Sequence, residues 1–169
     1  MYRIALLLCL ATCSCAQKPA TDITWLNIGV PISRVRMLLP CRPNNSSTSR
    51  LGGTVYEVSC ETDRFRATAS VKPHLSEFNA QTAKEEFEAD ELILKTMFGE
   101  IKDFKEDEVS KNERRYILTL KSGASIRARI FVNDYGVYDG FIGTKGTNSS
   151  PDFESVAEKF LNSIEPVNQ

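Results

Sequence analysis

Short runs of alternating apolar and polar residues fill the first half of the chain, and this period of two is typical of half-buried β-strands. Residues 53–60 and 64–72 alternate in this way, and residues 61–63 between them favour a turn. Two shorter apolar runs precede them, at 24–28 and 35–39. The pattern therefore predicts four strands, of which the last two form a hairpin.

A polar stretch separates the second of these runs from the third. Its sequence, Arg-Pro-Asn-Asn-Ser-Ser-Thr-Ser-Arg at residues 42–50, consists of residues that favour turns and contact with solvent. We therefore expect a solvent-exposed loop at this place.

Residues 80–98 are the first segment with helical character, since they are rich in Ala, Glu, Lys, Leu and Met. An apolar stripe at helical spacing runs along the segment and consists of Ala83, Phe87, Leu94 and Phe98. Asp90 and Glu91 interrupt this stripe, and Gly99 is placed to end the helix. The pattern predicts one long helix with one apolar face.

The second half of the chain repeats the order of strands followed by a helix. Four strands are predicted, at 101–109, 116–120, 126–132 and 137–142. Ser150 then serves as a helix cap, with Pro151 as the first helical residue. The apolar residues that follow have the spacing of an amphipathic helix: Phe153, Val156, Ala157, Phe160, Leu161 and Ile164.

This order predicts an α+β fold in a single domain, with an antiparallel sheet and two main helices packed on it, in the order strands, helix, strands, helix. A chain of 169 residues is the length of one ordinary domain. We assign the domain to residues 23–166 and a short polar tether to residues 17–22.

Residues 1–16 have the three zones of a secretory signal peptide: Arg3 as the sole charge, an apolar run of eight residues, and small residues up to the cleavage site. The apolar run is far shorter than the roughly 20 residues of a membrane-spanning helix. Cleavage after residue 16 is one route, and a lipoprotein route that attaches lipid to Cys13 or Cys15 is the alternative. Both routes predict an exported protein, periplasmic or secreted, and the second also anchors it to a membrane.

Charge and cysteine content narrow the classes of function. Without residues 1–16 the chain keeps 20 basic and 22 acidic residues, a net charge of −2, which argues against a nucleic-acid-binding protein. Cys41 and Cys60 also remain, and we expect them to form a disulfide in an oxidising compartment, with two separate buried thiols as the alternative. Closing this loop would stabilise the fold by about 3 kcal/mol.

The sequence offers little catalytic chemistry. His74 is the single histidine, which excludes a His-based triad or a multi-histidine metal site. Five carboxylates crowd the first predicted helix: Glu85, Glu86, Glu88, Asp90 and Glu91. Carboxylates in this number could bind calcium or magnesium, but on a helix they more often form the solvated face. We expect no enzymatic activity, no cofactor and no metal.

The most distinctive polar set lies in the strand at 126–132. Arg127, Arg129 and Phe131 share one face of this strand by the period of two. Two arginines beside an aromatic ring on an exposed sheet face suit the binding of an acidic or peptide partner. The alternative interpretation is a solvent-facing surface with cross-strand charge pairs.

Five segments together suggest a family. They are VRMLLP at 35–40, RYILTL at 115–120, IRARIFV at 126–132, GVY at 136–138 and FESVAEKFLNSI at 153–164. Their pattern and order resemble the PsbP/Mog1-like superfamily over residues 22–165. The resemblance implies an antiparallel sheet with helices packed on it, and a binding or assembly module. Relatives include extrinsic photosystem subunits, a Ran-binding nuclear protein, bacterial lipoproteins and secretion chaperones, and no functional residue carries over from them.

We therefore expect an exported, non-catalytic binding or assembly module of the cell envelope, with a protein partner and no nucleic acid. One alternative is an exported enzyme that uses carboxylates, which requires a deep pocket with convergent carboxylates of strongly perturbed pKa. The other alternative is a carrier of a small apolar ligand, which requires an apolar cavity between the sheet and the helices.

Overall fold

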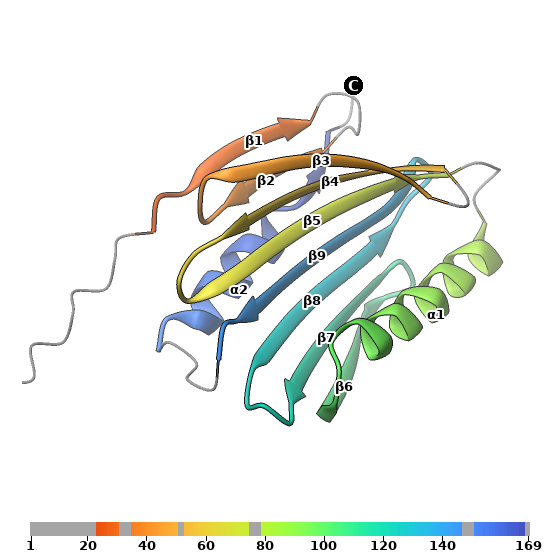
Figure 1. Cartoon of the computed structure of the whole chain (residues 1–169). Helices are drawn as coiled ribbons and strands as arrows, with labels where there is room; N and C mark the ends of the chain where they lie inside the picture. The colour runs from red at the N-terminus through yellow and green to blue at the C-terminus, as the bar shows by residue number, and fades with distance from the viewer. Residues whose placement is uncertain (1–22, 31–34, 51–52, 75–78, 147–150, 168–169) are drawn as a thin grey trace, which may run out of the picture.

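The computed structural model describes residues 23–30, 35–50, 53–74, 79–146 and 151–167. Within these ranges the chain forms two antiparallel sheets and two helices, in the order strands, helix, strands, helix (Figure 1). The α+β class and the packing of two helices on an antiparallel sheet are therefore confirmed.

Seven strands form the larger sheet, in the spatial order β3-β4-β5-β9-β8-β7-β6. They are β3 (Pro43–Arg50), β4 (Gly53–Glu61), β5 (Phe65–Pro73), β9 (Gly136–Thr144), β8 (Ser125–Val132), β7 (Glu113–Leu120) and β6 (Ile101–Ser110). The central pair β5–β9 joins the two halves of the chain in one antiparallel register, from Phe65↔Thr144 to Pro73↔Gly136.

Three short strands form the smaller sheet, in the order β1-β2-β10. They are β1 (Leu26–Val30), β2 (Val35–Leu39) and β10 (Glu165–Pro166). Because β10 follows the second helix directly and pairs with β2, the two ends of the described domain meet in this sheet. The smaller sheet and α2 (Phe153–Asn162) lie on one side of the larger sheet, and α1 (Ala80–Met97) lies on the other (Figure 1).

The alternation of side chains along each strand gives the larger sheet two apolar faces. One core lies between the sheet, α2 and the smaller sheet, and its largest members are Met37, Leu39, Phe65, Tyr138, Ile142, Phe153, Phe160 and Ile164. The other core lies between the sheet and α1, and its largest members are Phe87, Leu94, Tyr116, Leu118, Ile126 and Ile130.

The α1 face of the sheet changes character from one side to the other. The strand registers place Tyr116, Ala128 and Phe141 in one row, and this row continues into Thr68 and Ser59. The first three residues contribute to the core under α1, whereas the last two are polar and lie on the side of the sheet that this core does not include. α1 therefore covers about half of this face, over β6 to β9.

A side-chain cap defines the start of α1, and a glycine follows its end. The Asn79 side chain accepts hydrogen bonds from the backbone N–H groups of Gln81 (2.9 Å) and Thr82 (3.0 Å), which caps the helix at its start. The helix ends at Met97 with Phe98 as its C-cap residue, and Gly99 follows with φ 76°, a left-handed conformation that glycine adopts without strain. The predicted helix and its end are confirmed.

α2 approaches the sheet closely at a glycine. A Cβ atom added to Gly140 of β9 would lie 2.3 Å from Cδ1 of Ile164 and 2.9 Å from Cδ2 of Leu161. α2 begins at Phe153 with Asp152 as its N-cap residue, so the predicted start at Pro151 is wrong by two residues. Ser150, the predicted cap, lies outside the described residues.

Residues 42–50 are not the loop that their composition predicts. Pro43–Arg50 forms β3 and pairs with β4 in an unbroken register, from Pro43↔Cys60 to Arg50↔Gly53. In the described part of the sheet β3 is an end strand, and a polar composition suits that position because it discourages pairing with other chains.

Candidate functional site

Cys41 and Cys60 form a disulfide, as predicted, with Cα atoms 5.6 Å apart. The bond ties the start of β3 to β4, next to the registered pair Pro43↔Cys60. Disulfides persist in oxidising compartments, which agrees with the predicted export. Cys13 and Cys15, the predicted lipid attachment sites, lie outside the described residues.

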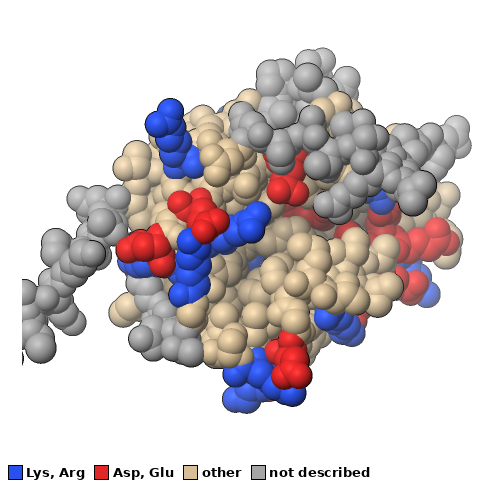
Figure 2. Space-filling view, viewed as in Figure 1, with Lys and Arg blue, Asp and Glu red and all other residues tan. Residues whose placement is uncertain are grey.

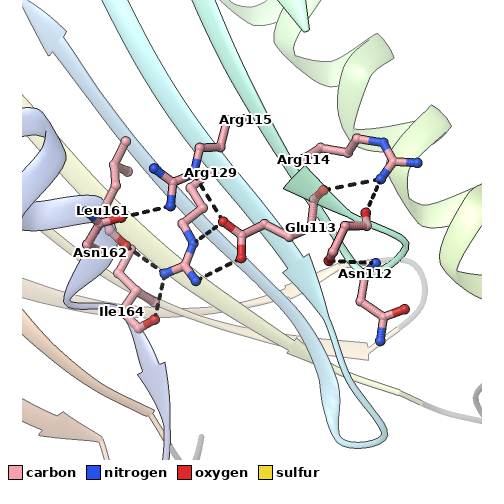
Figure 3. Close-up of polar contacts among 9 residues, drawn as sticks. Asn112, Glu113, Arg114, Arg115, Arg129, Leu161, Asn162 and Ile164 are labelled. Atoms are coloured by element: carbon pink, nitrogen blue, oxygen red, sulfur yellow. Dashed lines mark hydrogen bonds and ion pairs between the residues drawn. The ribbon is translucent and has the colours of Figure 1, made fainter. Parts of the chain in front are cut away.

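Arg129 lies between the larger sheet and the C-terminal end of α2 (Figure 3). Its Nε and Nη2 atoms donate to the two carboxylate oxygens of Glu113, at 2.9 and 3.1 Å. Its Nη1 atom donates to the backbone carbonyl oxygens of Leu161 (2.9 Å) and Ile164 (3.1 Å). The guanidinium group therefore binds carbonyl groups in the last turn of α2 and just after it, where backbone carbonyls lack i+4 partners.

Glu113 joins two arginines at this junction. Arg115 donates from Nε to the same carboxylate at 3.1 Å and from Nη2 to the side-chain oxygen of Asn162 at 2.8 Å. Burial by itself would raise the pKa of Glu113, but the hydrogen bonds and charges of Arg129 and Arg115 outweigh it and hold this pKa below its ordinary value. The carboxylate is thus ionised at neutral pH and holds both guanidinium groups in place.

Arg127 and Phe131 complete the predicted set, and both also contact groups of this chain. Arg127 forms an ion pair with Glu154 in the first turn of α2, with Nε 3.0 Å from one carboxylate oxygen. The Phe131 ring stacks on Tyr138 at 4.5 Å between centroids, and the Arg129 guanidinium lies 4.8 Å from the Phe131 centroid. The sheet face that the period of two assigned to solvent is covered by α2, so this expectation of exposure is wrong. Binding of a partner by Arg127, Arg129 and Phe131 stays a prediction.

A second polar cluster, which the sequence did not predict, lies between α1 and the middle of the sheet. Lys72 of β5 forms an ion pair with Glu86 of α1 at 2.6 Å. Ser70 Oγ donates to Asp139 Oδ2 at 3.0 Å. Within the described residues, Asp90 Oδ2 and Asp139 Oδ1 are buried and have no hydrogen-bond partner.

The electrostatics of this cluster raise the pKa values of both aspartates. Burial, and after it the negative charges of Asp139 and Glu86, raise the pKa of Asp90 to about 9. Burial raises the pKa of Asp139 to about 6, although the hydrogen bond from Ser70 opposes the shift. Asp90 is therefore protonated at neutral pH, and the titrations of the two carboxyl groups are coupled through the negative charge of Asp139.

Two signals in the sequence could have revealed this cluster, although the sequence analysis did not use them. Asp90 interrupts the apolar stripe of α1, at a position that the helical spacing assigns to the buried side. Asp139 occupies the α1 face of β9, between Val137 and Phe141 on the same side. The expectation that all five helix carboxylates form a solvated face is therefore wrong for Glu86 and Asp90, which turn toward the sheet.

The outer face of α1 is divided along its length. Glu85 and Glu88 are exposed in its first half, whereas Leu92 (64% exposed), Ile93 (39%) and Met97 (63%) lie in its second half. Figure 2 shows acidic side chains near the start of α1 and a mostly uncharged surface, bordered by a basic side chain, over its later turns. We call these five residues the outer α1 surface.

A pocket of about 270 Å³ lies elsewhere, at the smaller sheet, and is lined by Asn27, Arg36, Met37, Leu38, Ser163 and Glu165. An exposed ion pair between Arg36 and Glu165 (3.0 Å) borders it. Its lining comes from β1, β2, β10 and the end of α2, whereas the carrier alternative requires a cavity between the larger sheet and a helix. Neither Asp90 nor Asp139 lines it.

Metal-binding and membrane-spanning features are limited in the described ranges. There, no group of three or more His, Cys, Asp and Glu side chains is arranged to hold a metal ion. None of the helices described here is long and apolar enough to cross a membrane.

His74 Nε2 lies 2.8 Å from the backbone oxygen of Asn133, which connects the end of β5 to the turn between β8 and β9.

Comparison with protein-family models gives no match, and comparison with curated proteins gives none either. The resemblance to the PsbP/Mog1-like superfamily therefore stays a prediction based on the pattern and order of the segments quoted above.

Proposed function

We propose that this protein is an exported, non-catalytic binding or assembly module of the cell envelope and that it docks on a partner protein through the outer α1 surface. The observation that carries this proposal is the exposure of three large apolar side chains, Leu92, Ile93 and Met97, on one side of one helix. Clustered apolar side chains on a surface are typical of interaction sites, whereas single ones are ordinary.

The second helix of the same chain provides an internal comparison. The buried residues of α2 are all apolar, and its exposed residues are Glu154, Ser155, Glu158, Lys159 and Asn162. This is the ordinary division of a helix that only packs on its own domain. α1 buries Ala83, Phe87 and Leu94 in the same manner, so the exposed apolar residues of α1 are additional to those that hold it on the sheet.

A carboxylate-based enzyme is the alternative that the Asp90–Asp139 pair favours, since both pKa values are strongly raised. The two oxygens without hydrogen bonds are buried under α1, and a substrate would have to reach them there. The described pocket lies at the smaller sheet. The pair therefore fits a structural role better than a catalytic one.

Site-specific photo-crosslinking in cells that produce the protein tests the proposal. Ile93 and Ile117 form a matched pair, because they are the same residue type with 39% and 37% exposure, and Ile117 lies on the face of β7 opposite α1. We expect a photoreactive residue at position 93 to give one discrete adduct with an envelope protein and the same residue at position 117 to give none. Equal labelling at both positions, or no adduct at position 93, would overturn the proposal.

A further inference from the structure

Charge is distributed unevenly along the chain, and the outer α1 surface lies in the acidic part. Residues 80–110, which include α1 and β6, hold 4 basic and 10 acidic residues, a net charge of −6. The rest of the chain holds 17 basic and 12 acidic residues, a net charge of +5. Part of this excess is neutralised, because Asp90 is protonated at neutral pH and Lys72, Lys121 and Arg114 pair with carboxylates of this segment. Glu85 and Glu88 stay exposed on α1 and can attract a partner of opposite charge.

The net negative charge that α1 keeps is that of Glu85, because the other carboxylates of the helix are paired with lysines or, for Asp90, protonated. Lys84 lies 3.6 Å from Glu88 and Lys95 pairs with Glu91, so the two lysines of the helix each contact one carboxylate. Lys84 and Glu88 are 69% and 64% exposed, and an ion pair that exposed contributes little and is easily exchanged. Glu85 accepts a hydrogen bond from Gln81, which is neutral.

The spacing of the outer α1 surface defines what a partner must present. Glu85 and Leu92 are seven residues apart, which corresponds to about 10 Å along a helix. A partner helix of about three turns can therefore cover the acidic half and the apolar half at the same time. Its basic residues would lie at one end, and its apolar residues at the other.

We infer that the partner of the outer α1 surface presents a basic amphipathic segment, with Lys or Arg side chains against Glu85 and Glu88 and apolar side chains against Leu92, Ile93 and Met97. This inference rests on the proposed function and adds the chemistry of the partner. The same acidic charge disfavours an anionic membrane surface and a nucleic acid, because both would be repelled.

A synthetic peptide provides the probe: a labelled 14-residue amphipathic helix of Leu and Lys, compared with its Leu and Glu counterpart, added to the whole mature protein. We expect the Leu/Lys peptide to bind, and the double variant Glu85→Gln/Glu88→Gln to bind it about tenfold more weakly in fluorescence anisotropy. The double variant Ile93→Ser/Met97→Ser should weaken binding to a similar extent.

Matched variants keep this test specific to the surface. Asp134→Asn/Glu158→Gln removes two exposed carboxylates elsewhere, and Ile117→Ser replaces an equally exposed isoleucine. Both should leave binding of the Leu/Lys peptide unchanged. Equal weakening by these controls, equal binding of the Leu/Glu peptide, or no binding of the Leu/Lys peptide would overturn the inference.

Two further measurements test whether a membrane or a second copy of this chain, rather than a partner protein, occupies the outer α1 surface. Co-sedimentation with vesicles of phosphatidylglycerol and phosphatidylethanolamine would reveal membrane docking, and sedimentation velocity would reveal a dimer formed through the same surface. Dependence of either on Glu85 and Glu88 would overturn the inference in favour of that occupant. The two proposals can fail separately. If a crosslinked adduct forms at position 93 but the affinity for the Leu/Lys peptide does not change in Glu85→Gln/Glu88→Gln, the inferred partner chemistry is wrong and the proposed function is still supported.

Discussion

Arg129 and Glu113 form a two-point ion pair at the C-terminal end of α2, with side chains only 15% and 16% exposed. Neither residue belongs to the helix that the pair supports, since Glu113 begins β7 and Arg129 lies in β8. The pair couples the position of α2 to the hairpin on which it packs, because the same guanidinium also holds the carbonyl groups of Leu161 and Ile164.

We predict that Arg129→Met destabilises the protein by about 3–5 kcal/mol, because it leaves a largely buried carboxylate without its main partner. Urea unfolding followed by circular dichroism measures this loss. Arg36→Met is the matched control, since the ion pair of Arg36 with Glu165 is 61% and 56% exposed and should contribute less than about 1 kcal/mol. Equal losses from the two substitutions would contradict the assignment of a structural role to Arg129.

The lowered pKa of Glu113 predicts that its contribution to the free energy of unfolding decreases at low pH. A carboxylate whose folded-state pKa lies below its unfolded value of about 4.5 stabilises the fold above that pH and loses this contribution as pH falls. The free energy of unfolding of the native protein should therefore fall more steeply below pH 5 than that of Glu113→Gln. Parallel curves from pH 6 to pH 3 would show that Glu113 does not contribute in this way.

The raised pKa of Asp90 predicts the opposite dependence. Its folded-state pKa of about 9 exceeds its ordinary value of 3.8, so the folded state binds the extra proton between these limits and stability falls as pH rises through them. Asp90→Asn removes the ionisable group and keeps nearly the shape of the protonated side chain. We expect this variant to melt at a higher temperature than the native protein at pH 8 and at nearly the same temperature at pH 4.

Asp134→Asn is the control for this measurement, because Asp134 is exposed in the turn between β8 and β9. Its melting temperature should follow that of the native protein at both pH values. A loss of stability in Asp90→Asn at pH 8, measured by scanning calorimetry, would show that Asp90 is ionised in the folded protein.

We predict that the native protein is more stable than a variant without the disulfide, and that reducing conditions remove the difference. Cys41 and Cys60 are 19 residues apart, and closing a loop of this length stabilises a fold by about 3 kcal/mol in the chain-entropy model. The double variant Cys41→Ser/Cys60→Ser should lose about this amount in urea unfolding, and dithiothreitol should have no further effect on it. Titration of the denatured, unreduced mature chain should find neither thiol reactive.

Period and composition predicted most of the fold. The alternation of Phe65, Ala67, Ala69 and Val71 placed β5 correctly, and the spacing from Phe153 to Ile164 placed α2, because burial on one side dictates both patterns. β3 was missed because its residues between Pro43 and Arg50 favour turns, and its strand conformation depends on pairing with β4 rather than on local preference.

The candidate site was less predictable. Arg127 and Arg129 were recognised as unusual, but the period of a strand gives two faces without saying which one a later helix covers. Glu113 carries no local signal, since its role depends on a diagonal contact between neighbouring strands and on the end of α2. Asp90 and Asp139 each broke an apolar pattern, yet only the tertiary fold brings the two positions together.

Arg127 and Arg129 lie two residues apart on β8, yet one contacts Glu154 in the first turn of α2 and the other contacts the carbonyl groups where α2 ends. Two anchoring points define a line, so β8 helps to set the angle at which the helix crosses it, together with Arg115 of β7 at the end of the helix. Loss of either contact would loosen one end of the helix while the other end stays attached to the same strand, so we expect such a loss to affect the orientation of the helix more than its position.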